Sequence, residues 1–442
     1  MPMMHRQSPP APRLALLLGF LLVGGAACRA APAPRDTPAG AGRATQRAAQ
    51  DTRVLTGLEV LVRDSLHLVR GKRVGLITNQ TALSTTGEHA ADLLARTPGV
   101  RLTALFGPEH GIRGDIEAGK KIESGRDEKT GVPVYSLYGR TQRPTDEMLR
   151  EVDVLLFDIQ DIGARPYTFV WTMAMAMEEA AKRNIPFVVL DRPNPITARI
   201  DGPLMHMDVR EVTQVITGYY AVPLRHGMTS GEVARYYNED AKVGARLHVV
   251  PAAGWRGDEW FDRTGLRWIN PSPNIRSADA ALKYSGLVLA EATNLSTGRG
   301  TEAPFSYLGA PWMDAARVLE QTRRYELPGV RLDTVGFVPN SPDPNAWVPF
   351  RGERVRAVRL TVTDRERFDP VFTALVLLTE VKRLHPTQFR ITNEGFTQMI
   401  GSRWARAAFD RGEDPRVIAQ RWRQEVQEWS AKRDRYRLYP AD

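Results

Sequence analysis

The sequence predicts an α/β fold: a Rossmann-like parallel-sheet domain over residues 54–305 and a smaller C-terminal α+β domain over residues 306–442. In the first region, short and nearly continuous apolar runs alternate with helical patterns, which is typical of parallel strands covered by helices on both faces. In the second region this alternation stops, and isolated strand and helix patterns follow one another. A length of 442 residues also favours two domains over one core.

Five apolar runs are the predicted strands of the first domain, and each ends in polar or charged residues. They span residues 74–78, 102–106, 152–157, 187–190 and 287–290. In open α/β sheets, ligands bind outside the carboxyl ends of the strands. The sequence therefore predicts a site along one edge of the sheet, lined by carboxylates, amides and arginines.

A helix is predicted over residues 167–183, because Phe169, Met173, Met177 and Ala180 recur at helical spacing. The helix lies between two predicted strands. This order predicts a right-handed parallel crossover.

The C-terminal region carries two further helix signals and one strand signal. Asp369-Pro370 places an N-cap and a proline at the first helical position of a helix running to about residue 384. Residues 354–362 alternate as a strand does. Asp414-Pro415 begins a last helix with a single apolar stripe, made of Ile418, Trp422, Val426 and Trp429.

Residues 1–28 have the pattern of a signal peptide. Arg6 and Arg13 precede an apolar run over residues 14–23, and small residues lead to Cys28. Cys28, the one cysteine in the chain, is a candidate lipidation site, although Gly25 stands where lipoprotein signals prefer an aliphatic residue. Ordinary cleavage nearby, giving a soluble secreted protein, is the alternative. We expect an exported protein, periplasmic or anchored to a membrane as a lipoprotein.

Residues 29–53 are Ala, Pro, Arg, Gly and Thr with almost no large apolar side chain, and they predict a flexible linker. The net charge of +9 suits either an anionic partner or a solvated basic surface. The arginines are spread along the chain, and no nucleic-acid-binding motif is present, so no nucleic-acid partner is predicted. Contact with a membrane is expected only through the lipid anchor.

A dinucleotide cofactor is the obvious alternative for this fold. Residues 298–303, Gly-Arg-Gly-Thr-Glu-Ala, fit the bare Gly-x-Gly-x-x-Ala pattern, but they come late in the domain and Pro304 follows where a helix should begin. The chain has no phosphate-binding loop and no zinc-ligand spacing. We therefore expect no cofactor and no metal, and a nicotinamide-binding titration would test an oxidoreductase.

Six polar motifs occur in a fixed order along the predicted edge. They span residues 106–114 (FGPEHGIRG), 158–168 (DIQDIGARPYT), 191–195 (DRPNP), 226–232 (HGMTSGE), 271–274 (PSPN) and 291–301 (EATNLSTGRGT). Together they resemble the exo-β-N-acetylmuramidase (NamZ-like) family, from about Val54 to the C-terminus. The resemblance implies a glycoside hydrolase that releases N-acetylmuramic acid from the non-reducing end of peptidoglycan fragments, in cell-wall turnover or recycling.

The resemblance has two departures. The family usually carries Gly where this chain has Ala292, and Glu where it has Thr297. The second departure motivates an alternative, a peptidoglycan-binding lipoprotein that keeps the fold without catalysis.

Glycoside cleavage uses a proton donor and a second carboxylate or activated water. Glu109 is the predicted donor, on its position after a strand and on the family match; a structural pair with Arg113 is the alternative. The second catalytic group is sought among Asp158, Asp161 and Glu291, which all follow predicted strands, and Asp161 is preferred because it lies deeper in its loop. Tyr167 is a candidate hydrogen-bond partner.

The lactyl carboxylate of N-acetylmuramic acid is best bound by a guanidinium, and its hydroxyl and acetamido groups by side chains that both donate and accept. Each candidate also has a structural alternative, such as an ion pair within the fold. The predicted substrate-binding residues are Asn79, His110, Arg113, Asp158, Gln160, Arg165, Arg192, Asn194, His226, Asn274, Asn294 and Arg299.

Overall fold

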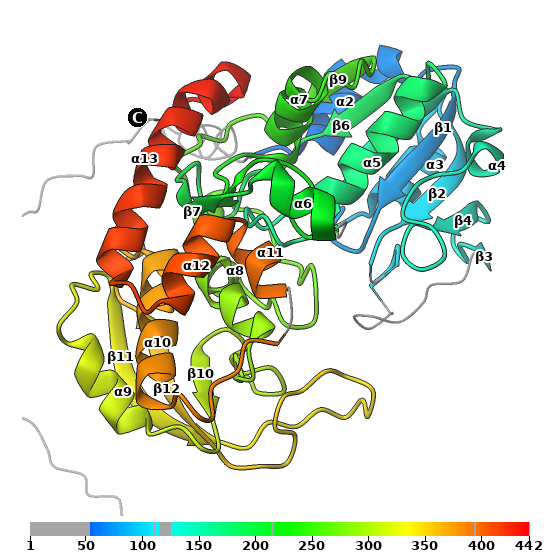
Figure 1. The fold of residues 1–442 in the computed structure, drawn as a ribbon. Helices are drawn as coiled ribbons and strands as arrows, with labels where there is room; N and C mark the ends of the chain where they lie inside the picture. The colour runs from blue at the N-terminus through cyan, green and yellow to red at the C-terminus, as the bar shows by residue number, and fades with distance from the viewer. Residues whose placement is uncertain (1–53, 110, 115–124, 214–215, 393–394, 442) are drawn as a thin grey trace, which may run out of the picture. The chain divides into compact units, whose positions relative to one another are not determined.

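The computed structural model describes residues 54–109, 111–114, 125–213, 216–392 and 395–441 (Figure 1). The predicted signal peptide, Cys28, the predicted linker and His110 lie outside these residues. No helix within the described ranges is long and apolar enough to cross a membrane.

A seven-stranded sheet in the order β3-β4-β2-β1-β5-β6-β9 forms the centre of the first half of the described chain (Figure 1). All neighbouring strands pair in parallel except β3 with β4, which are antiparallel. The α/β class predicted from the apolar runs is confirmed. The strands are β1 (Arg73–Thr78), β2 (Arg101–Gly107), β3 (Gly125–Arg126), β4 (Pro133–Ser136), β5 (Val154–Asp158), β6 (Phe187–Leu190) and β9 (Leu247–Val250).

Helices cover both faces of this sheet, which is why its strands are apolar on both sides. Leu76, Leu105 and Leu156 share one buried cluster with helices α2 (Gly57–Asp64) and α3 (Ala90–Arg96). The alternate residues, such as Phe106, Phe157 and Phe187, belong to a second cluster with α5 (Phe169–Lys182) and α7 (Ser230–Asp240). The alternation follows from the two-residue period of a strand.

The predicted helix over residues 167–183 is confirmed as α5. It begins at Phe169 because Thr168 is its N-cap, and Tyr167 stays in the preceding loop. α7 begins with a reciprocal capping box between Thr229 and Glu232. Other elements of this half are η1 (Leu66–Leu68), α4 (Asp146–Leu149), β7 (Asp201–Leu204), α6 (Met207–Thr213), β8 (Pro223–Arg225) and η2 (Phe261–Arg263); β7 and β8 form a separate antiparallel pair.

The predicted strand at residues 287–290 is wrong. These residues are the end of helix α8 (Ala278–Leu287) and the 3₁₀ helix η3 (Val288–Ala292) that continues it. The helix starts at an N-cap, Ser277, and its residues from Ala280 to Leu287 are all buried. A short apolar run does not distinguish a strand from a helix that is buried all round.

The C-terminal region adds a three-stranded antiparallel sheet, β10-β12-β11, and five helices among the described residues. The predicted strand and the two predicted helices are confirmed, and the four stripe residues of the last helix are buried. The elements are β10 (Tyr307–Ala310), α9 (Ala315–Thr322), β11 (Val330–Phe337), β12 (Val355–Val362), α10 (Pro370–Leu384), α11 (Gly395–Ile400), α12 (Arg403–Asp410), α13 (Pro415–Arg433) and η4 (Asp434–Tyr436).

One buried cluster runs from the sheet through α8 into α10, across the predicted boundary at residue 305, so the exact division into domains stays a prediction. The contact between α8 and α10 depends on Gly286. A Cβ on Gly286 would lie 2.0 Å from the carbonyl oxygen of Pro370. Glycine is therefore required for these two helices to approach this closely.

We predict that Gly286→Ala lowers the free energy of unfolding by about 1–3 kcal/mol, the range for overpacking a rigid contact. Urea denaturation of the purified protein measures it. Gly125→Ala is the matched control, because nothing lies within 4 Å of a Cβ there. Equal stability of the two variants would contradict the close packing of α8 on α10.

Candidate active site

The register of the sheet brings the ends of its strands together at one edge. Gly107 of β2 pairs in parallel with Ser136 of β4. Glu109 and Tyr138 each come two residues later, so both follow their strands at the same edge of the sheet. A hollow of about 510 Å³ lies here. It is lined by Glu109, Tyr138, Gly139, Gln142, Pro166, Tyr167, Thr168, Phe169, Ile216, Thr217, Ser272, Asn274, Ile275, Tyr284, Glu291, Arg299, Phe305 and Met399.

Glu109 lines this hollow with hydroxyl groups as its neighbours. Thr168 Oγ1 donates to Glu109 Oε2 over 3.4 Å. Burial, together with the charge and hydrogen bond of Glu109, raises the pKa of Tyr138 to about 12, so its phenol stays protonated near neutral pH. The alternative pairing with Arg113 is not found: Arg113 binds Asp92 and Asp127 instead.

Two further phenols line the same hollow. Burial raises the pKa of Tyr167 well above its usual value and also raises that of Tyr284. The Tyr167 hydroxyl is buried without a well-formed hydrogen bond in the described chain, although Ser272 is near enough to influence its pKa. Both rings pack edge-on against each other at 6.0 Å. These phenols are therefore neutral donors that face a space large enough for a sugar.

Glu291 and Arg299 form an ion pair on another wall of the hollow. Arg299 Nε donates to Glu291 Oε1 over 2.5 Å and Nη2 to Oε2 over 3.2 Å. Burial opposes the charge of Arg299, but Glu291 outweighs it and the pKa is raised. The Thr297 hydroxyl lies 3.5 Å from the same Oε1. Arg299 Nη1 takes no part in these two contacts with Glu291.

Asp161 is not among the residues that line the hollow. Its Oδ2 accepts from the Gly163 amide over 2.7 Å and is 3.5 Å from His226 Nε2. His226 Nδ1 accepts from the Met228 amide, so in the neutral ring the proton is on Nε2 and points toward Asp161. Both side chains are buried.

Asp158 and Arg192 form a buried ion pair at the ends of β5 and β6. Arg192 Nε and Nη2 donate to the two carboxylate oxygens over 2.5 and 3.0 Å. Arg192 and Gln160 line a separate hollow of about 240 Å³. Asn79 Oδ1 accepts from the Thr81 amide and hydroxyl, and these bonds stabilise the loop that follows β1.

Three other predicted binding residues make contacts within the fold. Asn194 donates to the Met228 carbonyl, and Asn294 donates to the Gln388 carbonyl. Arg165 is fully buried and donates to three backbone carbonyls, those of Pro203, Val222 and Met399. Burial lowers the pKa of Arg165 to about 9, so it is still charged at neutral pH.

Of the predicted residues that are described, the structure thus brings five to the main hollow: Glu109, Tyr167, Asn274, Glu291 and Arg299. No observation tests their catalytic or binding roles, which stay predictions.

The sequence reasoning missed several residues of the hollow. Tyr138 follows β4, a short strand that was not among the five apolar runs, although an aromatic residue after a strand is a usable signal. Tyr284 lies within α8, which was predicted in part as a strand, and Met399 comes from α11.

A second hollow of about 720 Å³ adjoins the first, because Asn274, Glu291 and Arg299 line both. Its other walls come from residues 300–302 and from the segment between β11 and β12.

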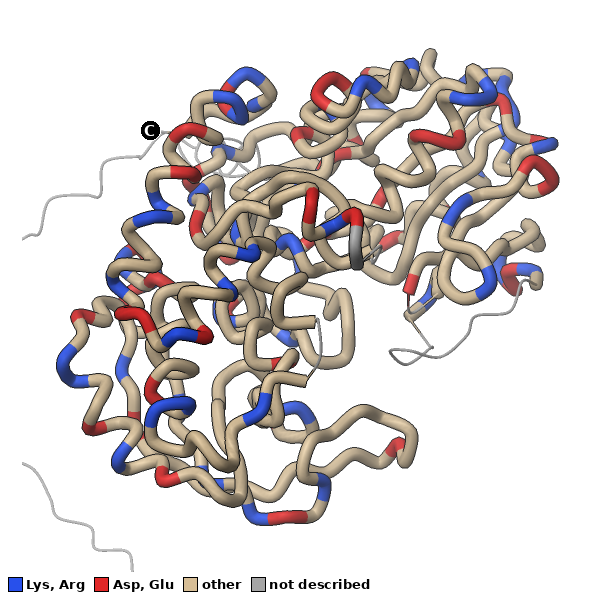
Figure 2. Tube along the Cα trace, in the orientation of Figure 1, with Lys and Arg blue, Asp and Glu red and all other residues tan. Residues whose placement is uncertain are grey.

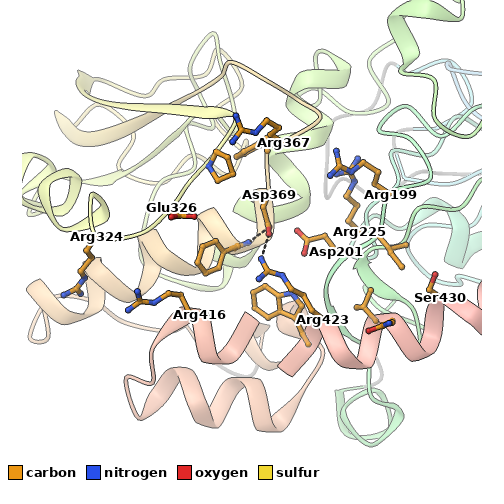
Figure 3. Close-up of a pocket in the computed structure, with 17 residues that line it drawn as sticks. Arg199, Asp201, Arg225, Arg324, Glu326, Arg367, Asp369, Arg416, Arg423 and Ser430 are labelled. Carbon is orange, nitrogen blue, oxygen red and sulfur yellow. Dashed lines mark hydrogen bonds and ion pairs between the residues drawn. The ribbon is translucent and has the colours of Figure 1, made fainter. Parts of the chain in front are cut away.

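A hollow of about 860 Å³ lies elsewhere and contains none of the predicted site residues (Figure 3). Its arginines are largely compensated: Arg423 binds Asp369 over 2.9 Å, and Arg416 binds Asp414. Asp201 Oδ2 is shielded from solvent here. Burial and the nearby charge of Asp369 raise the pKa of Asp201 well above its usual value.

Other sequence expectations concern charge and cofactors. Lys and Arg are interspersed with Asp and Glu over the described trace (Figure 2). Among the described residues, no three His, Cys, Asp or Glu side chains are grouped as metal ligands. Gly298 and Gly300 lie in a loop between η3 and β10. A dinucleotide site requires a strand directly before these glycines and a helix directly after them, and this loop has neither.

Comparisons with family models and with a curated protein point to the same family. Residues 74–279 match the family model "Exo-beta-N-acetylmuramidase NamZ, N-terminal", and residues 282–439 match its C-terminal counterpart. The chain is 40% identical over 393 residues to the peptidoglycan beta-N-acetylmuramidase NamZ of Bacillus subtilis (strain 168), covering 88% of this chain and 92% of that protein.

Two crystal structures of DUF1343 family proteins from Bacteroides fragilis NCTC 9343 are similar to this fold. One has a TM-score of 0.80 and 33% identity, and the other a TM-score of 0.72 and 27% identity. Each comparison covers 88% of this chain and 99% of the other.

We predict that Arg165→Met lowers the free energy of unfolding by about 3 kcal/mol, because it leaves buried carbonyls without donors. Chemical denaturation measures it. The control Arg63→Met removes an exposed pair with the neighbouring Asp64 and should leave stability unchanged. Equal unfolding midpoints for both variants would show that Arg165 does not hold these segments.

A pH-dependent effect is predicted at Asp201. The folded pKa of Asp201 is raised above the unfolded value of about 3.9, so folding favours the protonated carboxyl group. The protein is therefore more stable below that pH, and this stability is lost as the pH rises and ionisation favours the unfolded state. Asp201→Asn imitates the protonated form, so the variant should gain stability over the wild type between pH 4.5 and 7.5. Urea titrations at the two pH values measure this, with Asp258→Asn as an exposed control. A difference that does not grow with pH would refute the assignment.

Proposed function

We propose that this chain, which belongs to the exo-beta-N-acetylmuramidase NamZ family, is an exo-acting glycoside hydrolase. Its substrate is the non-reducing end of peptidoglycan fragments, from which it releases N-acetylmuramic acid in cell-wall turnover or recycling. The observation that carries the proposal is the hollow where Glu109, the Glu291–Arg299 pair and three neutral phenols meet. Its volume of about 510 Å³ is in the usual range for a small-ligand site.

Glu109 is the proposed general acid. Its carboxyl group would protonate the glycosidic oxygen as the bond to the sugar breaks. Thr168 and Tyr138 place hydroxyl groups beside it. A hydroxyl can hold the carboxyl group in place without fixing it as a permanently paired anion, which is what a proton donor requires.

Glu291 is the proposed second carboxylate, because it faces the hollow whereas Asp158 and Asp161 do not line it. The bidentate contact with Arg299 holds the Glu291 carboxylate in a fixed orientation. A carboxylate held in this way can stabilise the positive charge that develops on the sugar. The sequence analysis preferred Asp161 for this role, and activity measurements on variants of Asp161 and Glu291 would distinguish the two.

Recognition of N-acetylmuramic acid is assigned to Arg299 and Asn274. Arg299 Nη1, which is not used on Glu291, is available for the lactyl carboxylate. The Asn274 amide offers a donor and an acceptor for the acetamido group or hydroxyls. The neutral phenols of Tyr138, Tyr167 and Tyr284 add donors around the ring.

Export and a lipid anchor on Cys28 belong to the same proposal, since peptidoglycan lies outside the cytoplasm. The n-region, the apolar run and the cysteine of residues 1–28 support it. Labelling with a radioactive fatty acid, with Cys28→Ser as the control, distinguishes a lipoprotein from a soluble secreted protein.

A non-catalytic peptidoglycan-binding lipoprotein is the second candidate. Thr297 supports it, because a neutral hydroxyl lies 3.5 Å from Glu291 where the family usually has a carboxylate. This candidate predicts binding of wall fragments without turnover.

We predict that Glu109→Gln lowers kcat on a natural muramic-acid disaccharide by about 10³-fold or more, with a smaller change in KM, because the proton donor is lost. Product release is followed by chromatography. Glu147→Gln, an exposed change on α4, is the control and should retain wild-type activity. Wild-type turnover that persists in Glu109→Gln would remove Glu109 from this role, and binding without turnover in the wild type would favour the second candidate.

A further inference from the structure

We propose that the adjoining hollow of about 720 Å³ binds the leaving-group sugars of the glycan, with Trp347 as the surface on which one of them stacks. The inference rests on the proposed function. It adds a binding site to the bond-cleaving one: an exo-acting enzyme that removes the terminal sugar must place the remaining chain somewhere beyond the cleaved bond.

The first step is continuity between the two hollows. Asn274, Glu291 and Arg299 line both, so a chain that crosses the Glu291–Arg299 pair passes from one to the other without leaving a protein surface. The remaining chain begins at the oxygen that receives the proton from Glu109 in the first hollow, and it would extend past this pair into the second.

The second step is that the far wall is built and not a loose loop. Arg351 holds the segment between β11 and β12 from inside, donating to the carbonyls of Ser341 (2.9 Å) and Ala346 (2.6 Å). The Asn340 amide donates to the Gly300 carbonyl over 2.8 Å. Gly300 has φ +81°, and a Cβ there would lie 2.6 Å from Val348. The segment is thus docked on the motif that carries Arg299.

The third step is the exposed aromatic side chain on that wall. Trp347 is 54% exposed, and Val338 on the same segment is equally exposed. They are two of three large apolar side chains exposed in the described chain; the third, Val417, lies on α13. Both side chains line this hollow, so they give it an apolar surface that solvent can reach.

The fourth step is chemistry. A tryptophan ring offers a flat apolar face, which suits the C–H face of a pyranose. The Arg299 guanidinium lies 5.2 Å from the Trp347 ring centroid and 5.3 Å from that of Phe305, so it links the stacking surface to the cleavage site. Asn340, Thr301 and Glu302 line the same hollow and can bind hydroxyl or acetamido groups. The expected occupant is a β-linked chain of N-acetylated hexoses.

The test compares two substrates that share the sugar released. One is a tetrasaccharide with N-acetylmuramic acid at its non-reducing end, and the other is the β-fluoride of the same sugar, whose leaving group fills no sugar site. We expect Trp347→Ala to lower the ratio of kcat/KM for tetrasaccharide over fluoride by about tenfold, mainly through the KM for tetrasaccharide. Trp347→Phe should recover part of the ratio, and Val417→Ala should leave it unchanged.

An unchanged ratio in Trp347→Ala, or an equal ratio in Trp347→Ala and Val417→Ala, overturns the inference. If the wild type cleaves neither substrate, the proposed function fails, and calorimetric titration of the tetrasaccharide then decides the binding site by itself. Binding that weakens about tenfold in Trp347→Ala supports the site, and equal binding to wild type and variant rejects it.

Discussion

The buried guanidinium of Arg165 is the contact on which the arrangement of the active site depends. It joins three segments that are far apart in the sequence, through the carbonyls of Pro203, Val222 and Met399. The next two residues along its own loop, Pro166 and Tyr167, line the main hollow, and so does Met399. A Cβ on Gly401 would lie 2.7 Å from this guanidinium, so the chain around α11 is shaped to admit it. Because no carboxylate among the described residues compensates the charge, these carbonyls must stay in place to solvate it.

A second buried group, Asp191, holds the opposite side of the sheet edge. Its carboxylate accepts from the Thr229 hydroxyl, the Gly231 amide and the Tyr439 hydroxyl. Its carbonyl accepts from the Gly57 amide. The start of α2, the start of α7 and the C-terminal segment thus meet at one residue after β6. Burial raises the pKa of Asp191, and the three donors work against that rise. Together with Arg165 it fixes the loops at the strand ends.

Local patterns in the sequence predicted the elements that carry their own signals. Strand β1 is apolar and ends in a polar residue, and α10 and α13 begin with Asp-Pro caps, so their positions follow from short windows. The run at residues 287–290 failed because burial on all sides, not strand pairing, makes it apolar. Tyr138 and Trp347 were missed for another reason. Tyr138 reaches the hollow through the β2–β4 register, and Trp347 through the contact of its segment with Gly300. Both are long-range contacts, which the neighbouring sequence does not predict.

The residues of the predicted edge show how the fold separates structural charges from functional ones. Asp158 and Arg192 form the same kind of ion pair as Glu291 and Arg299, and Asp158 and Glu291 each come at the end of an apolar run in the sequence. The first pair is buried, and its arginine is also bound to a backbone carbonyl, so it has little capacity left for a ligand. In the second pair the arginine uses two of its three nitrogens on Glu291, and its side chain lines the hollow. Position in the sequence selects both pairs, but only the unused hydrogen-bonding capacity beside a hollow distinguishes the one that can act on a substrate.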